Sequence, residues 1–164
     1  MEWVYLDVFD KDVIPIAESL INKDLRNEGY KVEENPHVTI VPKFEYEQDI
    51  ELPELLPNQR FDVSGFKFWP DMEDPMIVML DVSDDMVIQL WRDEILTQIG
   101  KKSVKYKMVP PHITLFKAGN NGDEYDFRLD SKLRNNLLDD CKEIQFPIQV
   151  RANGLKIEDW QSGL

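Results

Sequence analysis

Cysteine, long apolar runs and basic residues are all scarce in this 164-residue sequence. The single cysteine, Cys141, cannot form an internal disulfide, which excludes a disulfide-stabilised scaffold and favours a reducing compartment. No apolar run reaches the roughly 18 residues that a membrane span needs, and residues 1–5 lack the basic start of a signal peptide. We therefore expect a cytoplasmic, monomeric protein with no membrane partner.

The shortage of basic residues also limits the partners. Lys and Arg number 19 against 32 Asp and Glu, so the formal net charge is −13. Such a charge repels long duplex nucleic acid unless the basic residues are concentrated in one place. The length matches one domain, and 42% hydrophobic residues suffice for a core. The sequence predicts a single domain spanning residues 1–164.

The sequence contains an internal repeat. Residues 6–14 and 80–88 are identical at six of nine positions. Each block follows a run rich in β-branched and aromatic residues, typical of a buried strand, and precedes apolar residues at helical spacing. The apolar stripes of the two expected helices are Ile14, Ala17, Ile21 and Leu25 in the first copy and Ile88, Trp91, Ile95 and Ile99 in the second.

Two further pairs of segments match in the same order, namely residues 35–40 with 110–115 and residues 65–68 with 154–157. The first repeat thus covers about residues 2–70 and the second about residues 75–158. A third helix is expected over residues 131–142. These features predict an α+β fold, a bilobal pseudo-twofold duplication in which two antiparallel sheets line a cleft and the helices lie outside.

Both histidines of the chain lie in the repeated segments, and a threonine follows each of them two residues later. The chain has only three threonines, so chance does not explain this coincidence. Residues two apart on a strand point to the same face, so each segment presents an imidazole beside a hydroxyl. The pairs are His37 with Thr39 and His112 with Thr114.

Two imidazoles facing each other across a cleft suit in-line displacement at phosphorus. One removes a proton from the attacking water or hydroxyl, the other protonates the leaving oxygen, and the hydroxyls of Thr39 and Thr114 bind the non-bridging oxygens. Histidine serves both roles because its reference pKa of about 6.5 permits either protonation state near neutral pH. We predict His37 and His112 as the catalytic acid and base, in an order that the sequence does not fix.

The segments Pro-His-Val-Thr-Ile and Pro-His-Ile-Thr-Leu, in two repeated halves, resemble the paired motifs of the two-histidine (2H) phosphoesterase superfamily. That superfamily includes the 2′-5′ RNA ligase-like proteins and the cyclic phosphodiesterases. The resemblance covers nearly the whole chain. It implies catalysis by His37 and His112, phosphate binding by Thr39 and Thr114, and action without metal or other cofactor on 2′,3′-cyclic phosphates or related nucleotides.

Positive charge is concentrated before the second motif, since residues 101–117 hold five lysines and no acidic residue. A phosphate site needs such a patch, and strand alternation favours Lys105 and Lys107 as substrate contacts, with Lys43 a weaker candidate. The alternative is a solvated loop without a role in binding. This cationic approach would admit a small nucleotide or an RNA end.

Aromatic residues offer a second kind of substrate contact. Phe116 shares the strand face of His112 if alternation continues, so it either stacks on a base or packs in the core. We expect Trp69 and Trp91 in the core, because Trp91 lies on the apolar stripe of its helix.

Other functions remain open. Two histidines without clustered cysteines or carboxylates make a poor zinc site, and no Gly-x-Ser-x-Gly nucleophile motif is present. The rival from another class is a module that sequesters a nucleotide without turnover. Within the enzyme interpretation the substrate is a 2′,3′-cyclic phosphate, a 2′-5′ linkage or a cyclic oligonucleotide messenger, the last degraded by an anti-defence enzyme.

Overall fold

The computed structural model describes residues 1–119 and 127–160. Their helices and strands, in chain order, are β1 (Glu2–Val8), α1 (Asp10–Leu20), α2 (Lys23–Asn27), β2 (Lys31–Val32), β3 (His37–Phe44), β4 (Arg60–Val63), β5 (Gly65–Trp69), β6 (Ile77–Asp81), α3 (Met86–Ile99), the 3-10 turn η1 (Lys101–Ser103), β7 (His112–Lys117), α4 (Ser131–Lys142) and β8 (Ile148–Asp159).

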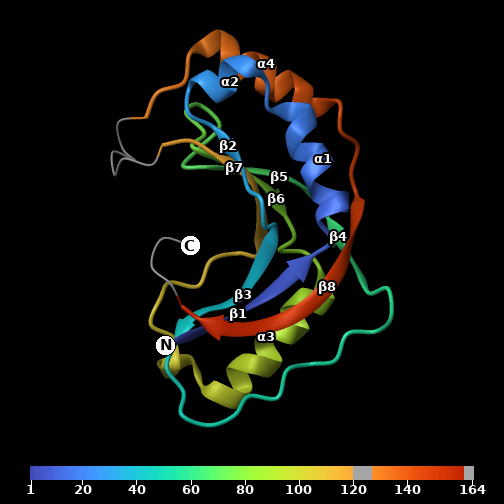
Figure 1. The fold of residues 1–164 in the computed structure, drawn as a ribbon, viewed down its shortest axis with the longest axis vertical. Coiled ribbons are helices and arrows are strands. Elements are labelled where there is room, and N and C mark those ends of the chain that lie inside the picture. The colour runs from blue at the N-terminus through green and yellow to red at the C-terminus, as the bar shows by residue number, and fades with distance from the viewer. Residues whose placement is uncertain (120–126, 161–164) are drawn as a thin grey trace.

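The strands form one curled antiparallel sheet of mixed α/β architecture (Figure 1). Its order is β4-β8-β1-β3-β7-β6-β5, and the short strand β2 also pairs with β7. Strands from both repeats therefore share a single sheet, where the sequence predicted two. The last strand of each repeat crosses over, because β5 pairs with β6 and β8 pairs with β1.

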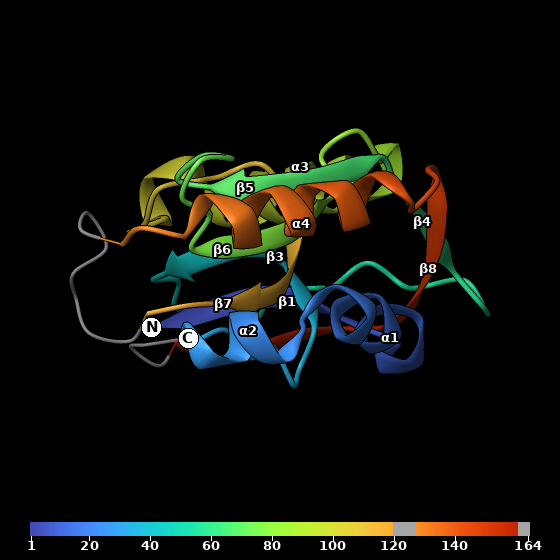
Figure 2. The same ribbon diagram turned by 90° about the horizontal axis from the view of Figure 1, so that it is seen from above.

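The two long helices also pack across the repeats. Helix α1 contacts β7, while α3 contacts β3, so each long helix packs on the histidine-bearing strand of the other half. Helices α1 and α4 also contact each other, and Figures 1 and 2 both place them at the same end of the molecule. The core beneath them contains fully buried strand residues, including Leu6, Val38, Ile40, Leu80 and Ile113.

Two of the three expected helices match the sequence prediction. The four stripe residues of α3 are all buried, Trp91 among them, and α4 covers residues 131–142 as expected. The first helix is different. It ends at Leu20, and α2 begins after Asn22, whose side chain accepts a hydrogen bond from the Leu25 backbone N–H at 2.8 Å. The apolar spacing continues across this break, so periodicity alone predicted one helix where two exist.

Each histidine-bearing strand contains a bulge at the same place in its repeat. In β3, Thr39 pairs with Tyr5 and Val41 pairs with Val4, which leaves Ile40 as the extra residue. A bulge reverses the alternation of the residues that follow it. The equivalent irregularity in β7 lies at Leu115, between the pairs Thr114 with Met79 and Phe116 with Val78.

The single cysteine is buried beside the core on α4. Burial raises the pKa of the Cys141 thiol to about 12, so the thiolate is scarcely populated at neutral pH. Cys141 is therefore a small apolar core residue and no nucleophile. No helix of the described residues has both the length and the apolar character that crossing a membrane requires.

Candidate active site

Both histidines begin a strand in the middle of the sheet. His37 opens β3 and His112 opens β7, and a buried proline precedes each of them. The two strands meet at Val38, which pairs with Ile113, and both of these side chains point into the core. The residues on either side of this pair therefore point to the opposite face, away from the helices.

The crossing of β3 and β7 brings the two predicted motifs together. Because the strands are antiparallel, the pairing of Val38 with Ile113 places His37 beside Thr114 and Thr39 beside His112. All four motif side chains are half-buried. The sheet thus presents two imidazoles and two hydroxyls on one surface, where the sequence predicted two sheets facing each other across a cleft.

A backbone carbonyl fixes the orientation of each imidazole. His37 Nδ1 lies 2.8 Å from the Asn35 carbonyl oxygen, and His112 Nδ1 lies 3.0 Å from that of Pro110. A carbonyl can only accept, so Nδ1 carries the proton in both rings. In the neutral form each Nε2 then bears the lone pair and is available to a substrate.

An equivalent row of residues crosses the sheet beside each histidine. In one half Asp81 pairs with His112 on one side and with Gly65 on the other. The other half contains the equivalent row Gly154, Asp7 and His37. The two aspartates differ in their partners: Asp81 accepts hydrogen bonds from the Ser83 backbone N–H at 2.9 Å and hydroxyl at 2.6 Å, while Asp7 accepts one from Asn153 at 2.9 Å.

His112 is affected by burial and by nearby charged groups. Burial lowers the pKa of His112, and the hydrogen bond to Pro110 partly opposes this shift. The nearby positive charges of Lys67 and Arg92, together with His37, lower the pKa further. His112 is therefore predominantly neutral at pH 7, with a free lone pair on Nε2.

Aromatic rings surround His37 instead. The Trp3 and Tyr5 rings lie edge-on to its imidazole, with centroids 5.3 and 5.7 Å away. Tyr5 stacks on Trp3 at 4.4 Å, and Trp3 in turn meets Trp160. Tyr106, which is 61% exposed, packs on Trp160 with a centroid distance of 5.5 Å and ends this row of rings.

Burial and a hydrogen bond to Glu158 raise the pKa of Tyr5 to about 12, so its hydroxyl remains a neutral donor. The indole Nε1 of Trp3 is buried and has no hydrogen-bond partner among the residues that the structure describes. The row formed by Trp3, Tyr5, Trp160 and Tyr106, which we call the aromatic wall, escaped the sequence prediction. The alternation of residues 2–8 could have predicted it. Val4, Leu6 and Val8 form the core face of this strand, so Trp3 and Tyr5 lie on its other face.

Arg92 of α3 binds the backbone next to both motifs. Its guanidinium donates hydrogen bonds to the carbonyl oxygens of Ile40 at 2.7 Å, Thr39 at 3.1 Å and Val109 at 2.9 Å. The first two carbonyls belong to the bulge of β3, and Val109 lies three residues before His112. In the other bulge, the Leu115 carbonyl accepts from the backbone N–H of Glu33 at 2.9 Å.

Of the two alternatives for Phe116, the structure confirms core packing and contradicts stacking on a base. Phe116 is fully buried and packs edge-on against Tyr30 with a centroid distance of 5.7 Å, so it is a core residue and cannot stack on a base. The bulge at Leu115 is the cause, because it reverses the alternation on which the prediction depended.

Two of the three candidate lysines, Lys43 and Lys105, lie away from the motifs. Lys43 is near the far end of β3, six residues and about 20 Å along the strand from His37. Lys105 donates its backbone N–H to the Lys43 carbonyl at 2.7 Å and its ammonium to the Lys102 carbonyl at 3.3 Å. Within the described ranges, neither Lys105 nor Lys107 forms a hydrogen bond or ion pair with a motif residue.

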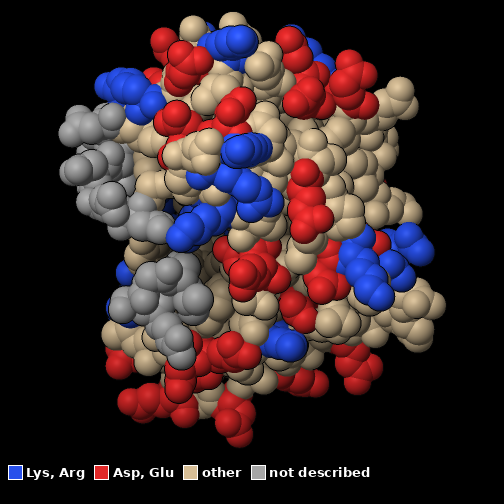
Figure 3. All heavy atoms as spheres, turned by 45° about the horizontal axis from the view of Figure 1, so that its top comes forward, with Lys and Arg blue, Asp and Glu red and all other residues tan. Residues whose placement is uncertain are grey.

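Basic side chains do not form one large patch on the face shown in Figure 3. On the face shown in Figure 3, acidic side chains are widespread and basic side chains form smaller separate groups. The lysine that acts on His112 is Lys67 of β5, which the sequence analysis did not single out. The repeat contained a signal, because Lys67 and Lys156 occupy equivalent positions in the matched segments.

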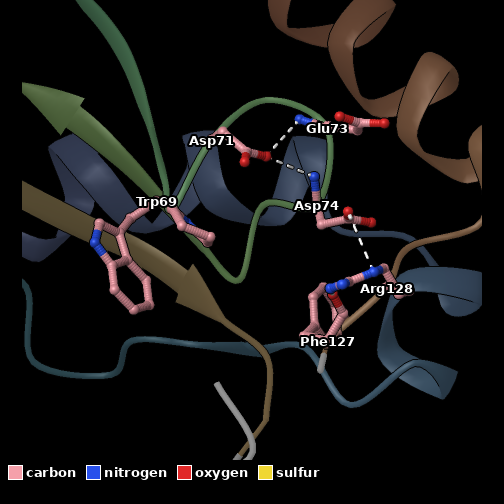
Figure 4. A pocket seen from close by; sticks show the side chains of 7 residues that line it. Trp69, Asp71, Glu73, Asp74, Phe127 and Arg128 are labelled. Carbon is pink, nitrogen blue, oxygen red and sulfur yellow. Dashed lines mark hydrogen bonds and ion pairs between the residues drawn. The ribbon is translucent and has the colours of Figure 1, made fainter. Parts of the chain in front are cut away.

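Trp69 is a correction to the sequence prediction, because it is 40% exposed at the end of β5 and not a core residue. It borders a pocket of about 430 Å³ that also contains Asp71, Asp74, Phe127 and Arg128 (Figure 4). The Asp71 carboxylate accepts the backbone N–H groups of Glu73 and Asp74, both at 2.9 Å, and Asp74 lies 4.0 Å from Arg128. No motif residue lines this pocket.

Among the described residues, no group of three or more His, Cys, Asp or Glu side chains is arranged to hold a metal ion. The arrangement can accept a proton at one imidazole, donate one at the other and hydrogen-bond an anionic oxygen through two hydroxyls. Comparison of the chain with protein-family models and with curated proteins found no match.

Proposed function

We propose that this protein is a phosphodiesterase that needs no metal ion and hydrolyses a 2′,3′-cyclic phosphate or a related cyclic or 2′-linked nucleotide. One observation carries the proposal: two imidazoles with free Nε2 atoms and two threonine hydroxyls share the face where β3 and β7 cross. Acid–base catalysis at phosphorus needs this set of groups. The 2H phosphoesterase resemblance points to the same chemistry.

The surroundings of the two histidines favour one assignment of roles. His112 is held neutral, so its Nε2 takes the proton of the attacking water as the new P–O bond forms. With His112 as the base, His37 takes the role of the acid. Its Nε2–H then protonates the leaving ribose oxygen as the cyclic P–O bond breaks, giving a phosphate monoester. Thr39 and Thr114 hydrogen-bond the non-bridging oxygens.

The pseudo-twofold duplication belongs to this proposal. Three matched pairs of segments, equivalent bulges and equivalent aspartate rows support it. A pseudo-twofold axis between β3 and β7 would relate the series β8-β1-β3 to β5-β6-β7, with the last strand exchanged. Such an axis explains why the two motifs meet and approach a phosphorus atom from opposite sides.

The aromatic wall supports a nucleotide as substrate. Tyr106 is largely exposed and Trp160 is half-buried, so both present ring surface on which a base can stack, at the end of the aromatic wall away from His37. The net charge of −13 disfavours long nucleic acid and is compatible with a small ligand or a strand end. These features also fit a module that sequesters a nucleotide, so turnover is the property to measure.

The test is multiple-turnover hydrolysis of 2′,3′-cyclic mononucleotides, 2′-5′ dinucleotides and cyclic oligonucleotides in EDTA, with products separated by chromatography. We expect turnover of at least one class, with kcat/KM rising with pH through an apparent pKa below about 6.5, since His112 must be neutral. The double variant His37→Ala with His112→Ala is the control. Tight binding with less than one turnover per molecule would instead identify a sequestering module.

A further inference from the structure

Lys67 lies on the face that carries the motifs. It occupies the middle of β5 and pairs with Met79 of β6, which in turn pairs with Thr114 of β7. Directly paired residues point to the same face of a sheet. The next row along the strands is Gly65, Asp81 and His112. Lys67 therefore lies diagonally across β6 from His112, and its charge acts on that imidazole.

The Lys67 ammonium is unpaired within the described ranges. The side chain is half-buried, yet it takes part in no hydrogen bond or ion pair that those residues form. Taking a cation partly out of water without a partner is unfavourable. Lys156, the residue at the equivalent position in the other half, has such a partner, since its ammonium lies 3.8 Å from the Asp7 carboxylate.

The other charged groups facing His112 are already engaged. Arg92 donates to three backbone carbonyls, and Asp81 accepts the Ser83 hydroxyl and backbone N–H. His37 donates its Nδ1–H to a carbonyl. Lys67 is thus the facing charge that still has hydrogen-bonding capacity.

Space for a ligand exists in the same half. A Cβ atom built on Gly65 would meet no heavy atom within 4 Å, so the surface beside Asp81 is open. Lys67 and Thr114, on either side of Met79, offer an ammonium and a hydroxyl next to this opening. An anion with several acceptor oxygens fits this combination, because charge-assisted hydrogen bonds are the stronger ones.

We propose that Lys67 and Thr114 form an anion subsite that receives the phosphoryl oxygens of the substrate over the β5–β6–β7 half of the sheet. This inference rests on the proposed function, which supplies the phosphate-containing substrate. It adds the half of the site on which the phosphate binds. The nucleoside then extends toward the aromatic wall on the other half.

The test measures binding of inorganic phosphate by NMR, following the Cε1–H resonances of the two histidines. We expect saturable binding to the wild type and at least about tenfold weaker binding to Lys67→Met, as removal of a charge-assisted hydrogen bond predicts. Lys67→Arg should remain within about threefold of the wild type, because the charge is kept. Lys156→Met, which removes the same charge from the equivalent position, should also remain within about threefold.

The free protein provides a second readout that a purely structural lysine would not affect. Without phosphate, the pKa of His112 should rise in Lys67→Met, because a positive charge near the imidazole is lost. Equal phosphate affinity in wild type and Lys67→Met overturns the subsite, as does the absence of phosphate binding at millimolar concentration. If phosphate binds as expected but no nucleotide is hydrolysed, the subsite stands and the phosphodiesterase proposal fails.

Discussion

The strand pairing beside the two histidines is equivalent, and the side chains around them differ. Each half of the molecule places a histidine first in a strand, an aspartate in the neighbouring strand and a glycine beyond it. Around His37 the groups are aromatic, and the equivalent lysine is neutralised by Asp7. Around His112 they are charged, and Lys67 has no partner among the described residues.

In the proposed function, this contrast gives one geometry two chemical roles. Both imidazoles lie on a common surface, and each Nδ1 donates its proton to a backbone carbonyl. Burial and neighbouring cations lower the pKa of His112, which favours the neutral ring that a base needs. His37 is then the proposed acid, because an acid and a base in one site need different surroundings.

The largest expected effect comes from removing one histidine at a time. His37→Ala and His112→Ala should each lower kcat for a cyclic nucleotide by about 10²–10⁴. A nitrophenyl phosphodiester should distinguish the two histidine variants, because its weakly basic leaving group departs without needing a proton from an acid. With that substrate, His37→Ala should recover most of its activity and His112→Ala should not. Recovery in His112→Ala alone would reverse the assignment of acid and base.

The two bulges offer a comparison in stability. Arg92→Met removes the donors of three carbonyls, and we expect the free energy of unfolding to fall by about 2–3 kcal/mol, measured by urea denaturation. Glu18 is the matched control, because it is exposed and occupies the equivalent position of the first repeat. The equivalent bulge, in β7, is capped by a backbone N–H and needs no side chain from this position. Glu18→Met should change stability by less than about 0.5 kcal/mol. Equal losses would mean that Arg92 does not support its bulge.

The smallest effect concerns the two glycines. A Cβ meets nothing within 4 Å at either Gly65 or Gly154, so both sites should accept valine without loss of fold. Gly65→Val fills the opening beside Asp81, and we expect phosphate affinity to fall about fivefold. Gly154→Val should leave phosphate affinity unchanged. Calorimetric titration with phosphate measures both, and a larger loss in Gly154→Val would place the anion on the other half.

The sequence predicts much of this site because the main signals are local. His-x-Thr spacing places each pair on one strand face, and the apolar stripe of residues 88–99 identifies α3 and its buried side. A short-range pattern needs only the regular geometry of one element.

The remaining features depend on which strands pair and where they are irregular. Phe116 is buried because of one extra residue in β7, which leaves no recognisable trace in composition. Lys67 reaches the second histidine only because β5 crosses to pair with β6 of the other repeat. Lys105 lies close in sequence to His112, yet it is tied to the far end of β3. Nearness along the chain therefore does not identify Lys67, whose charge acts on His112.

The position of β1 has a consequence for how the chain folds. Strand β1 lies between β3 and β8, so one of its edges is filled only by residues far along the sequence. During synthesis, that edge stays open until residues 148–159 have left the ribosome. Pairing of such distant segments slows folding, because a long loop must close before any contact rewards it. The sheet that assembles the site is thus completed only after β8 has been made.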